Sequence, residues 1–162
     1  MSTFIAKIRA FLSTILLTCA ASMMALICVI VFINAFSRYV FNSGFAWGEE
    51  AAVFAMIFGV MFGSAAAFLN DNHVKFSVIL DLFPDKVNFW LARLADLLMV
   101  IIGVALTYSG YLFTLRRGKI DSPAIGLEMA YFQSAIIVGG ALLVIVGLFK
   151  LCEQYFALQE SK

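Results

Sequence analysis

Charged side chains are scarce in this sequence. Only 13% of the 162 residues are Asp, Glu, Lys or Arg, whereas 64% are hydrophobic; soluble globular domains carry about 25% charged residues. The few charges are also unevenly distributed. Four runs carry none at all, at residues 10–37, 51–70, 97–115 and 129–149. A scarcity of charge in blocks of this length excludes an ordinary soluble domain.

Histidine, cysteine and catalytic motifs are equally sparse. The single histidine, His73, lies in the polar stretch NDNHVK, so a haem-binding bundle with axial histidines between its helices is excluded. Three cysteines do not form a disulfide framework. The sequence has no phosphate-binding loop, nucleophile motif or metal-ligand cluster, and a net charge of +1 gives no reason to expect nucleic-acid binding. We therefore expect a protein that is not an enzyme and that holds no metal or cofactor.

The four charge-free runs have the length of membrane-spanning helices. A helix needs about 20 residues to cross the hydrocarbon core of a bilayer, and the runs lack the alternating pattern of a membrane strand. Backbone groups in lipid must also be paired within their own segment, which favours helices. We predict an all-α membrane protein with one domain over residues 1–162. Its transmembrane helices are expected at about 10–37, 49–70, 88–115 and 128–150.

The segment between the second and third runs differs from an ordinary loop. The stretch HVKFSVILDLFP is apolar but interrupted by Lys75, Ser77 and Asp81, so it is too short and too polar to span a membrane. We predict a short amphipathic helix over about 74–84 that lies along the membrane surface and is ended by Pro84. The alternative is a buried re-entrant turn.

The lysines and arginines indicate which side of the membrane holds the termini. With four spans, both termini share one side with the loop between the second and third helices. That side carries seven basic residues and the other side four, so both termini are expected in the cytoplasm. The seven are Lys7, Arg9, Lys75, Lys86, Arg93, Lys150 and Lys162; the four are Arg38, Arg116, Arg117 and Lys119.

Small residues recur every four positions along the second predicted helix, at Ala51, Ala55, Gly59, Gly63 and Ala67. A stripe of this kind lets another backbone approach closely, and helix association in lipid depends on such packing. Two interpretations stay open. The stripe packs within the four-helix bundle of this chain, or it forms a docking face for another membrane protein.

One acidic residue lies about one turn inside the third predicted helix. Asp96 follows Arg93 by three positions, so the two side chains can form an ion pair on one helix face. Alternatively, Asp96 is an intramembrane functional acid. In that case the chain would be a stand-alone, dimeric four-helix exporter.

The stretch SRYVFNSGFAWGEE, at residues 37–50, places Arg38, Glu49 and Glu50 close together among aromatic residues. Acidic residues in a first helical turn complement the positive end of the helix dipole, by about 0.3–1 kcal/mol. Two consecutive residues of a helix point about 100° apart, so the glutamates face different surroundings. Arg38 is close enough to pair with either. An exposed pair would contribute less than about 1 kcal/mol.

This stretch strongly resembles a signature of the small (Q-type) membrane subunit of TRAP transporters, the tripartite ATP-independent periplasmic transporters. That signature is Arg-Tyr-x-Phe-Asn followed by Trp-x-Glu-Glu. The sequence HVK at residues 73–75 and the sequence SPAIGLEMA at 122–130 are similar to two looser family motifs, although Glu128 and Ala130 depart from the second. The residues that match the signature are Arg38, Tyr39, Phe41, Asn42, Trp47, Glu49 and Glu50.

The resemblance implies a multi-pass protein of the bacterial inner membrane. Its partners would be a large permease subunit, which moves substrate and sodium by an elevator-like motion, and a soluble periplasmic substrate-binding protein. The substrates would be organic acids such as sialic acid or C4-dicarboxylates, with the overall likeness leaning to the sialic acid systems. The small subunit would bind no substrate; it would brace the large subunit and help to dock the periplasmic protein.

Candidate interface residues follow from this resemblance, from the small-residue stripe and from the predicted surface helix, which could grip the flank of the large subunit. For contact with the large permease we expect Arg38, Tyr39, Trp47, Glu49, Glu50, Gly59, Gly63, Ile79 and Phe83. For contact with the periplasmic protein we expect Asn42, Ser43, Lys119 and Asp121.

Overall fold

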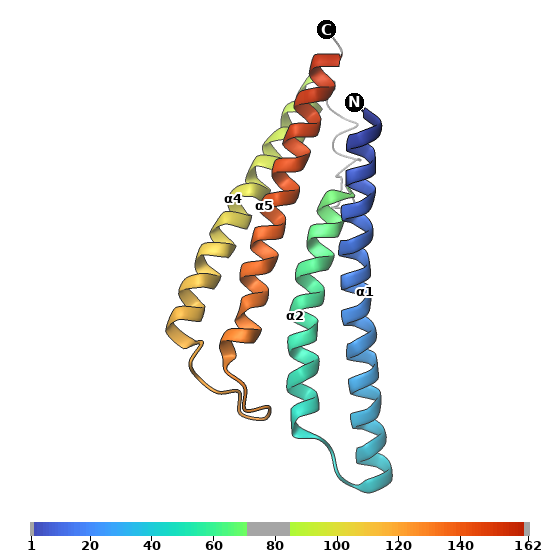
Figure 1. Ribbon diagram of the computed structural model, residues 1–162, viewed down its shortest axis with the longest axis vertical. Coiled ribbons are helices and arrows are strands. Elements are labelled where there is room, and N and C mark those ends of the chain that lie inside the picture. The colour runs from blue at the N-terminus through green and yellow to red at the C-terminus, as the bar shows by residue number, and fades with distance from the viewer. Residues whose placement is uncertain (1, 71–84, 161–162) are drawn as a thin grey trace.

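Four long helices make up the described part of the chain. The computed structural model describes the backbone of residues 2–70 and 85–160. The helices are α1 (Ser2–Phe41), α2 (Ala46–Leu69), α4 (Asp85–Arg117) and α5 (Met129–Glu160) (Figure 1). Each contains an apolar stretch long enough to cross a membrane. The prediction of an all-α membrane protein with four transmembrane helices is therefore confirmed. The surface helix predicted at about 74–84, with Ile79 and Phe83, lies outside the described residues.

Three of the helices are more than ten residues longer than their charge-free runs. Helix α1 has 40 residues, α4 has 33 and α5 has 32. At 1.5 Å per residue, α1 extends for about 60 Å, twice the thickness of a hydrocarbon core of about 30 Å. It must therefore tilt or protrude. The apolar run marks the part of a helix that lies in lipid, whereas residues such as Lys7, Arg38 and Arg117 continue the helix into the polar layers.

The helices form two hairpins joined side by side. Helix α1 packs along α2, α4 packs along α5, and contact between α2 and α5 joins the hairpins. Figure 1 shows α2 and α5 in the centre, both running from the end with the connecting loops to the end with the chain termini. We call these the loop end and the terminal end. In the most apolar stretch of each helix, only 6% of the α1 residues and 11% of the α4 residues are buried, against 28% for α2 and 39% for α5. The arrangement is thus an open layer with two exposed flanks.

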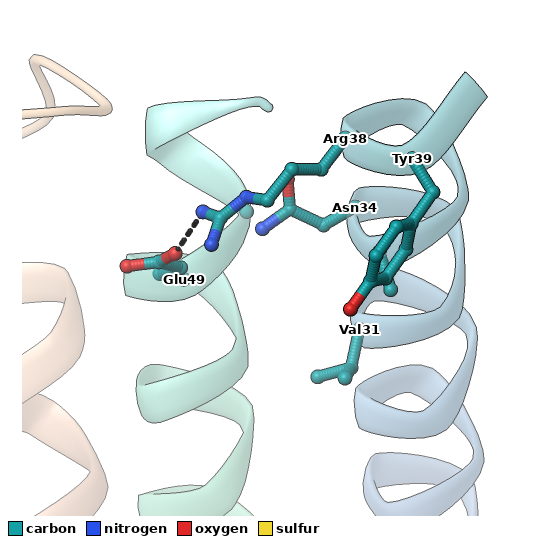
Figure 2. Close-up of a pocket in the computed structure, with 7 residues that line it drawn as sticks. Val31, Asn34, Arg38, Tyr39 and Glu49 are labelled. Carbon is teal, nitrogen blue, oxygen red and sulfur yellow. Dashed lines mark hydrogen bonds and ion pairs between the residues drawn. The ribbon is translucent and has the colours of Figure 1, made fainter. Parts of the chain in front are cut away.

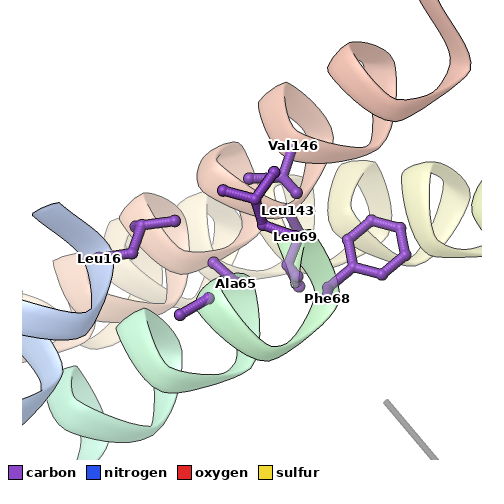
Figure 3. Packing of buried hydrophobic residues seen from close by; sticks show 7 residues of the cluster. Leu16, Ala65, Phe68, Leu69, Leu143 and Val146 are labelled. Carbon is purple, nitrogen blue, oxygen red and sulfur yellow. The ribbon is translucent and has the colours of Figure 1, made fainter. Parts of the chain in front are cut away.

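The buried core lies toward the terminal end, where α1, α2 and α5 meet (Figure 3). Alanines of α2 bring the helices close together, and larger side chains of α1 and α5 pack over them. Since lipid is as apolar as these side chains, close packing holds the helices together, not exclusion from water. The core residues are Leu16, Ala65, Ala66, Phe68, Leu69, Leu143 and Val146.

The glycines of α2 face α1. A Cβ atom added at Gly59 would lie 3.3 Å from Cβ of Met23, and one at Gly63 would lie 4.0 Å from Cβ of Ala20. The small-residue stripe thus packs within the chain, as the first of the two interpretations holds; both glycines are also partly exposed, and their contact with another subunit stays a prediction. Close helix packing between α1 and α2 needs small residues, and α2 supplies them to its own hairpin.

A second close contact joins α4 to α5. A Cβ atom added at Gly140 would lie 2.8 Å from the carbonyl oxygen of Gly103, a distance that a real side chain could not adopt. Glycine at position 140 therefore sets how closely the two helices of the second hairpin approach.

Candidate functional site

At the loop end, α1 turns into α2 through a short connection that α1 side chains hold in place. The side-chain oxygen of Asn34 accepts a 2.8 Å hydrogen bond from the backbone N–H of Phe45, and the Ser37 hydroxyl donates to the carbonyl of Ser43 at 2.6 Å. Both α1 side chains are buried, although they are polar. The chain reverses at Asn42, whose φ is 51°, a left-handed conformation that asparagine tolerates. The turn between α1 and α2 is thus fixed by the chain itself.

Arg38 and Glu49 form an ion pair across this turn. The Nη2 atom of Arg38 lies 2.8 Å from Oε1 of Glu49 (Figure 2). The two side chains are 62% and 67% exposed, so the pair contributes less than about 1 kcal/mol to the stability of the isolated chain. Tyr39 is 87% exposed and Trp47 is 49% exposed. We call this region the α1–α2 corner.

The α1–α2 corner encloses an open cavity of about 290 Å³ between the two helices (Figure 2). Its lining includes both apolar and polar side chains. Gly44 makes room for the arginine, since a Cβ atom there would lie 3.2 Å from Nε of Arg38, whereas a Cβ atom at Gly48 would lie at an ordinary contact distance of 3.5 Å from Cγ of Asn34. The cavity is lined by Val31, Asn34, Ala35, Arg38, Tyr39, Gly48 and Glu49.

Glu50 binds a different part of the molecule from Glu49. Its Oε2 atom accepts hydrogen bonds from the backbone N–H groups of Ala124 and Ile125, at 3.0 and 3.2 Å. These amides belong to the 118–128 loop between α4 and α5. Glu50 therefore links the first hairpin to the loop of the second, whereas Glu49 links α2 to α1.

The 118–128 loop has a regular structure of its own. The backbone N–H of Ser122 donates to the carbonyl of Leu127 at 2.8 Å, and Gly126 reverses the chain with a φ of 73°. Lys119 and Asp121 are exposed on this loop, and Asn42 and Ser43 are exposed on the loop of the first hairpin. The four residues expected to contact the periplasmic protein thus lie at one end of the molecule.

A second polar cluster, which sequence reasoning missed, surrounds the C-terminal end of α2. The last carbonyl groups of a helix lack partners within that helix. Here Arg9 of α1 donates to the carbonyl of Leu69 at 2.8 Å, and Lys150 of α5 donates to the carbonyl of Phe68 at 3.4 Å. Asn70 and Ser13 also share hydrogen bonds of 2.9 and 3.0 Å. Two cations thus complement the negative end of the α2 dipole.

The same cluster contains a buried ion pair. Lys150 Nζ lies 3.0 Å from Oδ1 of Asp96, with the side chains only 11% and 6% exposed, and 4.4 Å from the centre of the Phe68 ring. The pair that we expected, between Arg93 and Asp96, is not the one that the structure forms. Asp96 lies on the α4 face that packs against α5, where Lys150 reaches it, whereas Arg93 is partly exposed.

All four helices meet in this cluster, which we call the terminal-end clasp. Arg9 comes from α1, the carbonyls of Phe68 and Leu69 from α2, Asp96 from α4 and Lys150 from α5. Glu153 of α5 adds a 3.4 Å contact to Arg9. In the sequence, Arg9 and Lys150 indicated only the orientation in the membrane; the available signal was that each stands directly beside a charge-free run.

Comparison with known proteins identifies the family of this chain. Residues 27–156 match the family described as "Tripartite ATP-independent periplasmic transporters, DctQ component". The match covers the last part of α1, all of α2 and α4 and most of α5, and it includes the α1–α2 corner. The chain belongs to the DctQ family. It is thus a membrane component of a transporter, as the resemblance at residues 38–50 indicated.

Curated relatives of this DctQ-family chain carry consistent names. Two Haemophilus influenzae proteins, named as TRAP transporter small permease proteins, are 26% and 21% identical to it over 136 residues. The alignments cover 83% of this chain and 84% and 82% of the relatives. The sialic acid TRAP transporter small permease protein SiaQ of Vibrio cholerae is 23% identical over 124 residues, covering 76% of this chain and 69% of that protein.

Proposed function

We propose that this chain is the small permease subunit of a sodium-coupled TRAP transporter for organic acids. It braces the large permease subunit in the bacterial inner membrane and provides part of the surface that docks the periplasmic substrate-binding protein. Both of its termini face the cytoplasm, an orientation supported by the seven lysines and arginines on that side against four on the other.

The observation that carries this proposal is the way the charged groups are used. Asp96 and Lys150 join α4 to α5, Arg9 joins α1 to α2, and Glu50 joins α2 to the 118–128 loop. These contacts tie helices to one another at both ends of the layer. These polar groups hold the helices of the chain to one another, which suits a brace. A carrier instead needs polar groups at a substrate site near the middle of the membrane.

The α1–α2 corner is the proposed contact with the large permease. Its ion pair is too exposed to add much to the stability of the chain, and its aromatic residues Tyr39 and Trp47 are also exposed. A partner that covers the corner would remove water from the pair of Arg38 and Glu49. The pair would then fix the register and orientation of the two subunits.

Alanine substitution at the corner separates this role from a role in folding. Arg38→Ala and Glu49→Ala should each change the unfolding free energy of the isolated chain by less than about 1 kcal/mol, while reducing copurification of the large subunit and sodium-driven uptake. Arg116→Ala is the matched control, because it removes an exposed arginine at the same end of the other hairpin. It should leave copurification and uptake unchanged. Intact copurification and full uptake in the two corner variants would refute the proposed contact.

The substrate class is proposed from the relatives. The Vibrio cholerae relative is named for sialic acid, and the names of the two Haemophilus influenzae relatives give no substrate. We propose sialic acid or a C4-dicarboxylate as the transported acid. Uptake of the two labelled compounds into vesicles that contain all three components would decide between them; uptake of neither would refute this assignment.

A stand-alone exporter is disfavoured by the surroundings of Asp96. That carboxylate is buried and paired with Lys150, which also contacts the end of α2. Both groups are thereby held in a helix contact. The chain reconstituted alone in vesicles should move no solute, whereas transport without any partner would favour the exporter.

A further inference from the structure

Helix α4 carries a continuous stripe of large, exposed side chains along the side that faces away from α5. The residues recur every three or four positions, the spacing that places them on one helix face, and each is between 48% and 72% exposed. We call them the α4 stripe: Trp90, Leu94, Leu97, Ile101, Val104, Tyr108, Tyr111 and Leu115.

The opposite side of α4 has the reverse composition. Gly103 and Gly110 lie against side chains of α5, and Asp96 pairs with Lys150 there. Small and polar residues thus lie on the inward side of α4, beside Met99 and Leu106, which pack against the core, whereas the outward side carries the large residues of the stripe. This pattern is the inverse of a helix on a soluble protein. It is expected where the surroundings are as apolar as the residues and helices associate through small side chains.

The aromatic residues of the α4 stripe are spaced to fit a bilayer. Trp90 and Tyr111 are 21 residues apart in the sequence, which corresponds to about 32 Å along a helix. The hydrocarbon core of a bilayer is about 30 Å thick, and Trp and Tyr are enriched at its two interfaces. The residues between Trp90 and Tyr108 on the stripe are all aliphatic. Each end of the stripe is therefore suited to the interface and its middle to the hydrocarbon.

Two exposed arginines beyond the stripe also fit the position of a bilayer. Arg116 and Arg117 follow Tyr111 by five and six residues, about 8 Å further along the helix. They lie where the phosphate groups of the lipids would be, and their positive charge complements those phosphates. Small exposed residues occur on both flanks, such as Ala21 of α1 and Ala105 of α4, but those of α4 lie beside the stripe and not on it.

We propose that the α4 stripe is the lipid-facing flank of the assembled transporter. Its occupant is the phospholipid bilayer, and the large permease docks on another side of the layer. This proposal rests on the proposed function only in that it assumes that the chain assembles with a large permease. Residues 90 and 111 then lie at the two interfaces and Ile101 lies midway between them.

Spin labels test both parts of the proposal. In a chain whose three cysteines are replaced by serine, single cysteines at Trp90, Ile101 and Tyr111 are labelled with a nitroxide. Met99→Cys is the matched inward control, because Met99 lies at nearly the same depth but packs against the core. Accessibility to oxygen, which concentrates in lipid, and to a water-soluble nickel chelate is measured in phospholipid vesicles. The measurement is made for the chain alone and after assembly with the large permease.

The expected result for the chain alone is a depth profile that is deepest at Ile101 and shallow at residues 90 and 111. On assembly, oxygen accessibility at Ile101 should stay unchanged and well above that at Met99. A fall at Ile101 to the level of Met99 would show that the permease covers the stripe and would overturn the proposal, as would a profile whose maximum lies elsewhere. If no complex forms, the proposed function fails, while the depth profile of the chain alone still tests the stripe.

Discussion

Breaking the buried ion pair of the terminal-end clasp should destabilise the chain strongly. Asp96 and Lys150 lie 3.0 Å apart, with side chains that are 6% and 11% exposed, so solvent screens their interaction little. Removing one partner of a buried ion pair is strongly destabilising, by about 3–5 kcal/mol. We therefore expect Asp96→Asn and Lys150→Met each to lower the unfolding free energy by about 3 kcal/mol, roughly a 150-fold change in the folding equilibrium.

The double variant gives the sharper test. With both charges removed, no unpaired charge remains, and replacement of a whole buried pair by neutral residues is often nearly neutral. We therefore expect the loss in Asp96→Asn with Lys150→Met to be smaller than the sum of the single losses, by about 2 kcal/mol. The measurement is reversible unfolding in mixed detergent micelles, followed by circular dichroism.

Arg93→Gln is the control for this cycle. Arg93 is the partner that helix spacing favours, but it is partly exposed and does not pair with Asp96. Its substitution should change the unfolding free energy by no more than about 0.5 kcal/mol. The reasoning is refuted if the losses in the two single variants simply add, or if Arg93→Gln destabilises as much as Asp96→Asn does.

Two further predictions concern the loop end and the helix contacts. Glu50→Ala should accelerate hydrogen exchange about tenfold at the two amides of the 118–128 loop that this carboxylate binds, since a hydrogen bond to a charged group contributes about 1.5 kcal/mol. Glu49→Ala is the control and should leave these amides protected. Equal effects of the two substitutions would contradict the assignment. Gly140→Ala should lower the unfolding free energy by about 1–3 kcal/mol because the new methyl group meets the α4 backbone. Gly63→Ala, whose Cβ has ordinary contact distance, should be tolerated; comparable losses in both would show that the α4 contact is not limiting.

The number and class of the helices could be predicted from the sequence because they depend on the lengths of apolar runs. The ends of the helices could not. Residues such as Lys7 and Arg117 end a charge-free run but continue the helix, because a charged side chain can reach the polar layer from a helix that has already left the hydrocarbon.

Which side chains meet between helices depends on how the two hairpins pack together, and the spacing of residues along one helix does not predict that packing. Arg93 stands three positions from Asp96, which suggested a pair, but the carboxylate instead meets Lys150, 54 residues away in the sequence. Glu49 and Glu50 are neighbours with the same chemistry; their 100° separation predicted that they diverge, but not that Glu50 would bind two backbone amides of a distant loop.

The terminal-end clasp also bears on how the chain is made. Synthesis proceeds from the N-terminus, so Arg9 is available to the end of α2 as soon as the first hairpin has entered the membrane. Lys150 belongs to the last helix, and both Asp96 and the carbonyl of Phe68 await it. A nascent chain that lacks α5 thus has Asp96 in its third span without the ion pair to Lys150. The final helix therefore brings α4 and the end of α2 into the same cluster, and the terminal-end clasp is the last polar contact of the layer to form.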